Sequence, residues 1–502
     1  MRKLSKSKLI AYRQCPKRLW LEIHRPDLRE DSAATQAIFS VGHSVGEIAQ
    51  RLYDPLGTGV LLDPQREGFN SAFRRSLELL ATDQPIFEAG YAIEGALAFA
   101  DVMMPGEQSG QRVWHMVEVK SSTSVKDYQR DDTAIQAYIA RQAGVPLASV
   151  ALAHIDTEFI YPGAGDYRGL LKEQDLTEEA FARESEVREW IAAAHIVAEQ
   201  SVEPEITTGD QCGSPFACGF YDYCAAQEPK AEYPVYWLPR IQSPTLRAHI
   251  EAHPALDLRD TPDELLNDIQ KRVKQCTLSG ETYFDAAGAA AMLSGQTLPA
   301  YFLDFESIQF AVPQWAGSRP FQQICFQFSL HTLDRSGKLE STAFLDLSGN
   351  DPSRAFAEAL IAACGKTGPV YVYNAGFEGA RIGELADRYS DLAAGLLAIK
   401  QRLFDLLPIT RTHYYHPSQQ GSWSIKAVLP TVAPDLSYEA LDGVQNGGMA
   451  MDAYLEAIHP DTTSERKAEI ERQLLAYCGL DTFAMVRLWQ FLASRTDLEF
   501  QA

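Results

Sequence analysis

Strand-like apolar segments occur in two separate blocks of this chain, and the stretch between the blocks has a different composition. Residues 226–297 are rich in Pro and Asp and hold only short helical pieces, which separates the blocks. In the first block, strand patterns at residues 91–104 and 111–120 alternate with helical patterns at residues 9–22, 38–53, 131–143 and 177–200. In the second block, strands at YFLDFES, QQICFQFSLHTL, STAFLDL and PVYVYN are followed by helices. The pattern predicts an α/β fold in each half, with domains at residues 1–230 and 298–502 and a helical connector at residues 231–297.

The negative net charge of the chain limits the ways in which it can bind nucleic acid. Its net charge is −22, which argues against a protein that coats nucleic acid with a uniformly basic surface. The first twenty residues nevertheless hold seven Lys or Arg and no acid, which is either a local phosphate-binding patch or a solvated helix face. The many carboxylates are compatible with metal-dependent catalysis, because bound cations neutralise some of them.

We expect neither a membrane span nor a signal peptide in this sequence. There is no run of 18 apolar residues, so we expect no membrane span and no membrane partner. The basic start lacks the apolar core of a signal peptide. We therefore expect a cytoplasmic protein, in which the eight cysteines do not form structural disulfides.

Carboxylates and a lysine come together in the first block. Asp101 lies near the end of the first strand pattern, and Glu118 and Lys120 lie on the second. Side chains alternate along a strand, so Glu118 and Lys120 share a face, and Asp101 can join them from the neighbouring strand. Two acids can hold a divalent cation at a phosphodiester, and the lysine can orient the attacking water or stabilise the developing charge.

Two further residues lie in helical segments on either side of these three. Glu47 precedes them in a helical segment, and Gln136 follows them in another. An acid on a helix, then Asp, Glu-x-Lys and a helical Gln resembles the PD-(D/E)xK nucleases, most closely the RecB-like group that includes the CRISPR-associated iron–sulfur exonucleases. The resemblance covers residues 5–225. It implies a restriction-endonuclease-like domain that cleaves DNA, with Glu47, Asp101 and Glu118 as metal ligands and Lys120 and Gln136 as catalytic residues.

Two positions depart from that family pattern. The family usually has His in its first motif, and His43 is the alternative ligand to Glu47 here. Its Gln motif usually continues to a Tyr four residues later, whereas Tyr138 follows Gln136 after two.

Four cysteines form a separate pattern. Cys15 follows the basic start, and Cys212, Cys218 and Cys224 lie in DQCGSPFACGFYDYC. Thiolates in such a loop select zinc or an iron–sulfur cluster. One cysteine before the domain core and three after it resemble the RecB-like and AddB-type nucleases, which implies a structural 4Fe–4S cluster that ties the ends of the domain together. Zn²⁺ on the same ligands, or an incidental grouping, are the alternatives. We interpret the remaining cysteines as small core residues: Cys276, Cys325, Cys364 and Cys478.

The second block holds four more acids. Asp304 and Glu306 lie two apart on a strand and share a face. Glu378 begins a helix after a buried strand, and Asp481 lies on a helix near the C-terminus. Four acids from such positions can hold two divalent ions, which stabilise the attacking and leaving oxygens of a phosphoryl transfer.

The order of these motifs is more informative than any one of them. Asp-x-Glu is followed by Asn374-x-x-x-Glu378 and then by Tyr477-x-x-x-Asp481. This order resembles the ribonuclease-H-like exonucleases of the DnaQ type, in their tyrosine-bearing DEDD subgroup, which more often have Asp where this chain has Glu378. The resemblance implies 3′→5′ exonuclease chemistry with Tyr477 orienting the attacking water. We expect Asp405, in RLFDLLPI, either to support the acids or to act as a structural cap. We expect Lys426, in GSWSIKAVLP, either to meet a phosphate or to be a solvated lysine on a helix.

These motifs together predict a nuclease with two active sites. Both sites would use Mg²⁺ or Mn²⁺, since oxygen ligands favour hard ions, and DNA is the expected substrate ahead of RNA. The alternative is a nucleic-acid-binding or adaptor protein in which one or both sites are inactive. The chain as a whole also resembles a bacterial family of uncharacterised function, which implies no substrate.

Overall fold

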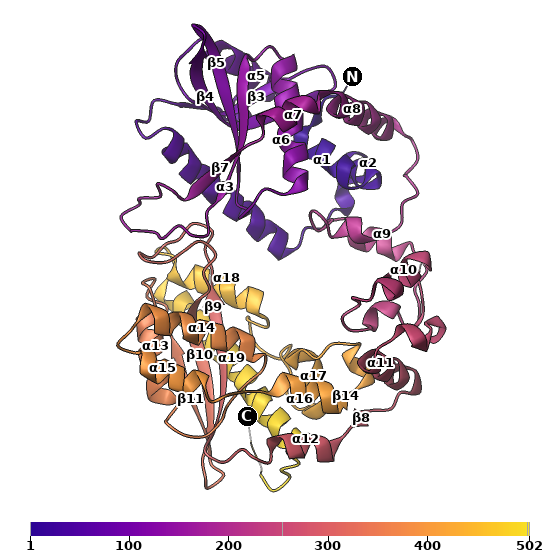
Figure 1. Ribbon diagram of the computed structural model, residues 1–502, viewed down its shortest axis with the longest axis vertical. Helices are drawn as coiled ribbons and strands as arrows, with labels where there is room; N and C mark the ends of the chain where they lie inside the picture. The colour runs from indigo at the N-terminus through magenta and orange to yellow at the C-terminus, as the bar shows by residue number, and fades with distance from the viewer. Residues whose placement is uncertain (1, 254, 499, 501–502) are drawn as a thin grey trace. The chain divides into compact units, whose positions relative to one another are not determined.

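The chain is a mixed α/β protein that divides into two compact units (Figure 1). The computed structural model describes residues 2–253, 255–498 and 500. Unit 1 comprises Met1–Glu228 with Phe310–Gln322, and unit 2 comprises Pro229–Gln309 with Gln323–Ala502. In the described part of the chain, no helix has both the length and the apolar character that crossing a bilayer requires.

Unit 1 is built on a seven-stranded mixed sheet. Its strands are β1 (Leu4–Ser5), β2 (Val60–Leu61), β3 (Ile86–Ala92), β4 (Ala96–Gln108), β5 (Gln111–Lys120), β6 (Leu147–Ile155) and β7 (Leu171–Asp175). They follow the order β2-β3-β4-β5-β6-β7, and β1 pairs with β4. The predicted strand over residues 91–104 was wrong at its start, because the chain turns at residues 93–95 and Tyr91 belongs to β3. The hairpin turn of β4 and β5 lies at Ser109 and Gly110, both with positive φ, so residues 105–108, between the two predicted strand patterns, also belong to β4.

Helices cover both faces of this sheet. They are α1 (Lys6–Gln14), α2 (Pro16–His24), α3 (Ala33–Tyr53), α4 (Pro64–Glu67), α5 (Phe69–Leu79), α6 (Asp127–Gln142), α7 (Thr177–Ala182), α8 (Glu184–Glu199) and α9 (Tyr221–Ala226), with 3₁₀ turns η1 (Pro26–Leu28) and η2 (Asp210–Cys212). The Ser5 hydroxyl caps α1 by accepting the Lys8 N–H at 3.3 Å. The single helix predicted over residues 9–22 is interrupted at Cys15, which is extended because Pro16 follows it.

Unit 2 contains a five-stranded sheet. Its strands are β9 (Ala300–Ile308), β10 (Ile324–Leu333), β11 (Leu339–Leu345), β12 (Val370–Val372) and β13 (Leu403–Asp405). They follow the order β11-β10-β9-β12-β13, in which the first three are antiparallel and β12 runs parallel to both neighbours. A small second sheet pairs β8 (Tyr283–Phe284) with β14 (Tyr414–Tyr415).

The helices of unit 2 leave the central strand β9 buried between two layers. They are α10 (Pro244–Ala252), α11 (Asp268–Ser279), α12 (Ala286–Leu293), α13 (Ser353–Ala363), α14 (Ala375–Arg388), α15 (Ala393–Lys400), α16 (Leu406–His413), α17 (Ile425–Val432), α18 (Gly447–Ile458) and α19 (Ser464–Leu492), with 3₁₀ turns η3 (Val235–Trp237), η4 (Leu258–Asp260), η5 (Asp263–Leu265) and η6 (Pro417–Gln419). Phe305 packs against Phe356 of α13 with ring centroids 5.0 Å apart, whereas Phe302 on the other face packs against Trp489 of α19 at 5.8 Å. Residues of β9 with even numbers therefore face α19.

Two segments are placed differently from the sequence-based division of the chain. Part of the stretch interpreted as a connector, residues 231–297, packs into the core of unit 2, where Val273 and Leu258 are buried in one cluster with Trp489. The tip of the β9–β10 connection belongs to unit 1, where backbone hydrogen bonds join Tyr161 to Ser318 at 3.0 Å and to Gly317 at 2.8 Å.

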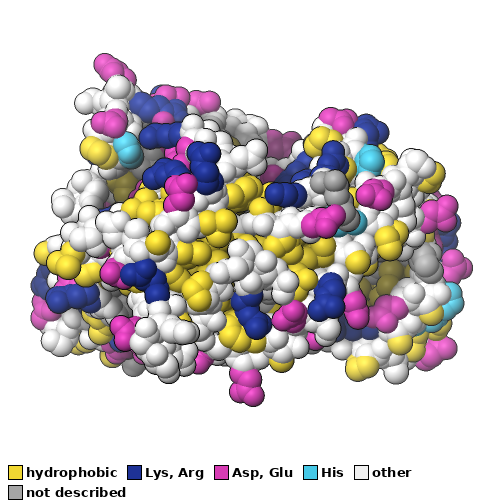
Figure 2. All heavy atoms as spheres, turned by 90° about the horizontal axis from the view of Figure 1, so that it is seen from above, with side chains coloured by type: hydrophobic (Ala, Val, Ile, Leu, Met, Phe, Trp, Pro, Cys, Tyr) yellow, Lys and Arg dark blue, Asp and Glu magenta, His cyan; other side chains and the backbone are white. Residues whose placement is uncertain are grey.

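The surface charge is mixed rather than segregated on the face drawn in Figure 2. Acidic and basic side chains lie side by side there, with hydrophobic side chains exposed between them. The net charge of −22 therefore does not make this face uniformly acidic.

Candidate active sites and the four-cysteine pocket

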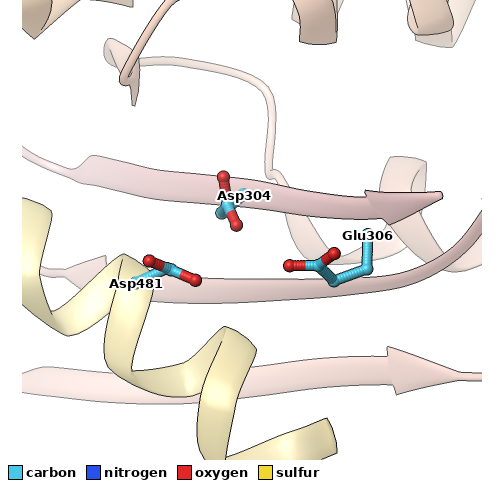
Figure 3. Close-up of side chains that lie close together, drawn as sticks. All are labelled: Asp304, Glu306 and Asp481. Carbon is cyan, nitrogen blue, oxygen red and sulfur yellow. The ribbon is translucent and has the colours of Figure 1, made fainter. Parts of the chain in front are cut away.

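Three acids of unit 2 converge between β9 and α19. Asp304 and Glu306 project from one face of β9, and Asp481 faces them from α19 (Figure 3). Ligand oxygens of the three carboxylates all lie within 4.8 Å of one another. Among the described residues this is the one group of three or more acidic, His or Cys side chains with such spacing. The structure thus brings together three of the four acids that the sequence predicted for this site.

The electrostatics of this group disfavour its fully ionised form. Burial raises the pKa of Asp304 well above its usual range, and the charges of Asp481 and Glu306 raise it further. Burial together with Asp481 also raises the pKa of Glu306 to about 8. The pKa of Asp481 is raised by burial to about 6, and the Tyr438 hydroxyl limits this shift by donating to its Oδ1 at 2.6 Å. A divalent cation between these groups would favour their charged forms.

Glu378 lies close to this group without joining the set of three. It stands in the first turn of α14 and is 3 % exposed, and its Oε2 has no hydrogen-bond partner among the described residues. Burial raises the pKa of Glu378 to about 8, and the charge of Glu378 in turn raises the pKa of Asp304. A buried carboxylate oxygen without a hydrogen-bond partner is costly. A cation bound by Glu378 would supply the partner that this oxygen lacks.

Asp405 and Asn374 organise the backbone beside Glu378. The Asp405 carboxylate, at the end of β13, accepts the N–H groups of Asn374 and Ala375 at 3.0 Å each. It also accepts the Leu407 N–H at 2.9 Å and so caps α16. Asn374 has φ +90, a conformation that Asn tolerates better than most residues, and it turns the chain from β12 into α14. Both residues thus hold the helix that carries Glu378.

Lys426 and Tyr477 form a pair at the edge of the acidic group. The Lys426 ammonium donates to the Tyr477 Oη at 3.0 Å and to the Gln445 carbonyl at 3.1 Å. The positive charge of Lys426 opposes the increase in the pKa of Glu306. A phenol held by a cation beside the acids has the position needed to orient a water molecule. Tyr438, which sequence analysis missed, lies outside every motif and is found only because its loop folds back onto α19.

In unit 1 the strands β4 and β5 separate at Asp101. The β4–β5 pairing ends at Val102 and Val117, and beyond it the Asp101 Oδ2 accepts the Val119 N–H at 2.7 Å. Burial raises the pKa of Asp101 well above its usual value, and the charge of Glu118 adds to this. The carboxylate therefore lies in the gap between the two strands, beside Glu118.

Glu118 is the centre of a charged network. It is 1 % exposed and accepts hydrogen bonds from Lys120 at 2.6 Å, Lys6 at 2.8 Å and the Gln136 amide at 2.6 Å. Burial alone would raise the pKa of Glu118, yet the two lysines hold it well below its usual range. Lys120 also donates to Asp132 at 2.7 Å. The structure brings together Asp101, Glu118, Lys120 and Gln136 as predicted and adds Lys6 and Asp132, which no motif contained.

Glu88 is a further acid that sequence analysis missed. It falls between the β3–β4 pairs Phe87–Val102 and Ala89–Ala100, so the register places it across from Asp101, and its φ is +56. Burial raises the pKa of Glu88, and the charge of Glu118 raises it further. Such an irregularity inside a strand has no signature in the sequence.

Glu47 and Tyr138 are not brought to this network. The Glu47 side chain is 55 % exposed, and its carboxylate lies 3.4 Å from the His43 Nε2. The pKa of Glu88 is lowered by the charge of Lys6 and, to a smaller extent, by that of His43, the alternative first-motif residue. Tyr138 packs against the apolar core of unit 1.

The four cysteines predicted as a group line one pocket of unit 1. Cys15 lies between α1 and α2, and Cys212, Cys218 and Cys224 lie in the loop and helix that follow residue 209. Burial raises the pKa of Cys224 to about 11, and the charges of the other three cysteines raise it as well. The Gln14 amide fastens this loop by donating to the carbonyls of Gln211 at 2.6 Å and Phe216 at 2.8 Å.

The distances between these thiols can be compared with those between the ligands of a metal ion. No three of the four sulfur atoms lie within 4.8 Å of one another. Four thiolates on one zinc ion, at Zn–S distances of about 2.3 Å, would lie roughly 3.8 Å apart. The four thiols, as they line this pocket, are thus not spaced as the ligands of one zinc ion are.

Comparison with known proteins adds one match. Residues 301–424 match a domain of unknown function, DUF2779. The matched region contains Asp304, Glu306 and Glu378 and ends before Tyr477 and Asp481. No curated protein matches the chain.

Proposed function

We propose that this protein is a metal-dependent nuclease with two active sites, of which the site in unit 2 is a 3′→5′ exonuclease. One observation carries the proposal: Asp304, Glu306 and Asp481 converge within 4.8 Å, beside the unpartnered carboxylate of Glu378. Their raised pKa values reflect negative charges crowded together in a buried place, which a divalent cation would neutralise. Oxygen ligands favour Mg²⁺ or Mn²⁺ as that cation. The order of motifs that resembles the DnaQ-type exonucleases supports a ribonuclease-H-like assignment of this unit.

The residues of unit 2 have distinct roles in this proposal. Asp304, Glu306, Glu378 and Asp481 would hold the cations, which supply stabilisation of the attacking and leaving oxygens. Tyr477 would orient the attacking water through its hydroxyl, and Lys426, which donates to that hydroxyl, would keep it in place. Tyr438 would hold Asp481 in its ligand orientation.

The site in unit 1 is proposed as a RecB-like nuclease site acting on DNA. Asp101 and Glu118 would hold its cation, with Glu88 as a further carboxylate across from Asp101, and Lys120 would stabilise the charge on the phosphate. Cys15, Cys212, Cys218 and Cys224, which line one pocket, would hold a structural 4Fe–4S cluster. This assignment rests on the resemblance of the cysteine pattern to that of the RecB-like and AddB-type nucleases.

A second candidate is a nucleic-acid-binding or adaptor protein with an inactive site in unit 1. One observation favours it: Lys6 and Lys120 already neutralise Glu118, and Glu47 stands apart from the network. A cation at Glu118 would have to displace one of these lysines.

Cleavage assays separate the two candidates. The purified chain is incubated with single- and double-stranded DNA and RNA, labelled at either end, with Mg²⁺ or Mn²⁺. The proposal predicts stepwise loss of nucleotides from 3′ ends, abolished in Asp304→Asn, and a second cleavage activity that persists in that variant and is abolished in Lys120→Met. Cleavage that neither change reduces would refute the proposal, and loss of activity in Asp304→Asn alone, with Lys120→Met unaffected, would favour an inactive site in unit 1.

A further inference from the structure

A cavity with both polar and apolar lining residues lies in unit 2, and none of the four acids lines it. Its lining includes Arg240, Asn267, Arg411, Ser422 and Trp423, and no acidic side chain. These residues come from the segment after η3, the start of α11, the end of α16 and the loop before α17. Figure 1 shows α11, α16 and α17 gathered around β14.

The two arginines of this cavity lack partners. Across the described residues, neither guanidinium of Arg240 or Arg411 forms an ion pair or a hydrogen bond. Nearby arginines are engaged, since Arg259 pairs with Asp257 at 2.9 Å and Arg272 donates to the Thr412 carbonyl at 2.6 Å. In a chain with net charge −22, two unpaired guanidinium groups at one acid-free cavity indicate a site for anions, and arginine is well suited to phosphate.

The wall of the cavity is fixed by its backbone and by buried hydrogen bonds. Gly421 has φ +80, and a Cβ at this position would collide with the carbonyl of Trp237 in η3. Trp423 is 5 % exposed, and its indole N–H donates to the Tyr414 carbonyl at 2.8 Å. The cavity is therefore built before any ligand arrives.

Two connections run from this wall to the acidic group. Trp423 is followed by Ser424, which caps α17, and by Lys426, whose ammonium meets Tyr477 at 3.0 Å. The Trp423 carbonyl accepts the Tyr373 hydroxyl at 2.6 Å, and Tyr373 lies directly before Asn374 and α14. The wall of the cavity is therefore continuous with the residues that surround the acids, through Lys426 and Tyr477 on one path and through Tyr373 and α14 on the other.

Building on the proposed function, we propose that this cavity binds the phosphate backbone of the single strand whose 3′ end is cut at the Asp304 group. Arg240 and Arg411 contact phosphates on the 5′ side of the scissile bond. Tyr236, in η3 immediately before this segment, has its side chain 73 % exposed and offers a ring for base stacking. A stacking ring four residues before Arg240 in the chain would favour a strand over a free anion.

Binding without turnover tests this assignment. Fluorescence anisotropy with a labelled oligothymidylate of about twelve nucleotides in EDTA compares the wild type with Arg240→Gln, Arg411→Gln and the double variant. We expect each single change to weaken binding about 5-fold and to reduce the slope of log affinity against log salt by about 0.7. Lys366→Gln, an exposed lysine before β12 and outside the cavity, is the charge-matched control and should bind like the wild type. Arg411→Lys should recover part of the lost affinity, which a folding defect would not allow.

Cleavage assays with a small and a large substrate distinguish strand binding at the cavity from hydrolysis at the acidic group. With Mn²⁺, the double variant should hydrolyse the p-nitrophenyl ester of thymidine 5′-monophosphate at the wild-type rate, because this substrate is too small to reach the arginines. It should cleave the oligonucleotide at least several-fold more slowly. Unchanged oligonucleotide affinity in the double variant overturns the inference, as does equally tight, arginine-dependent binding of inorganic phosphate. A wild type that cleaves neither substrate refutes the proposed function, and the binding data still decide whether the cavity holds a strand.

Discussion

At the scale of single residues, Glu378 is the acid whose contribution can be measured most cleanly. Its Oε2 is buried without a partner, so its ionised form destabilises the protein when no metal is bound. We predict that Glu378→Gln raises the stability of the metal-free protein by about 1–3 kcal/mol and weakens Mn²⁺ binding at least tenfold. Thermal unfolding with and without Mn²⁺ measures both effects.

The matched control for this change is Glu384→Gln, because Glu384 lies on the same helix α14 and its carboxylate pairs with Arg381 near the surface. It should alter neither the unfolding temperature nor the Mn²⁺ effect by much. A metal-free Glu378→Gln protein that is less stable than the wild type would show that the carboxylate has a structural partner.

The raised pKa values also predict how metal binding depends on pH. In the metal-free protein Glu306 and Glu378 have pKa values of about 8 and Asp481 of about 6, above the ordinary range for carboxyl groups. Cation binding needs their ionised forms, so affinity for Mn²⁺ should rise from pH 6 to pH 8 and level off above that. The folded protein binds more protons than the unfolded chain in this window, so the stability of the metal-free protein should fall as pH rises. Calorimetric titration in buffers of different ionisation enthalpy measures the protons released, and an affinity that does not change between pH 6 and pH 8 would contradict the assignment.

Strand periodicity was enough to predict which residues share a face, as for Asp304 with Glu306. It could not predict Glu88, which depends on an irregularity in β3, or Lys6 and Tyr438, which reach their sites from segments without a motif. Such residues join a site only through the tertiary fold.

At the scale of elements, the break between α1 and α2 is the feature that places Cys15 beside the distant cysteines. Pro16 ends the helical hydrogen bonding and leaves Cys15 extended, so the helix pair turns at the pocket. The apolar pattern alone predicted one continuous helix here, because the spacing of Leu9, Leu19 and Leu21 does not reveal the break.

The cysteine pocket leads to a prediction about cofactor content. Anaerobically purified protein should contain close to four iron and four sulfide per chain and show the broad visible absorption of an iron–sulfur cluster. Cys224→Ser should reduce iron content and lower the unfolding temperature of unit 1, because the cluster joins segments about 200 residues apart. Cys276→Ser, at a buried cysteine outside the pocket, should keep its iron. Stoichiometric zinc without sulfide would refute the cluster.

At the scale of the whole molecule, the course of the chain differs from a simple sequence of domains. The tip of the β9–β10 connection belongs to unit 1, where Ala311 packs in one cluster with Val45 and Leu170. The composition of residues 226–297 predicted a boundary, and unit 2 does begin at Pro229. The composition of Phe310–Gln322 gives no sign that this segment packs in unit 1, because its apolar residues are not unusual for a loop.

This topology predicts that residues 1–228 expressed alone lack part of their core. The isolated segment should be less stable than unit 1 in the full chain by about 1–3 kcal/mol, because it loses the hydrogen bonds of Tyr161 to Gly317 and Ser318. Hydrogen exchange should report faster exchange at the Tyr161 amide, with the β4–β5 amides as the internal reference. Equal protection of Tyr161 in both proteins would show that the segment contributes nothing to unit 1.

The central claim is that Asp304, Glu306, Glu378 and Asp481 hold divalent cations. Anomalous diffraction from crystals soaked in Mn²⁺ tests it directly, because the manganese positions are seen without any assumption about substrate. We expect two anomalous peaks about 4 Å apart, bounded by these four carboxylates, and their loss in Asp304→Asn. Crystals that bind Mn²⁺ elsewhere and show no peak between Asp304 and Asp481 would contradict it.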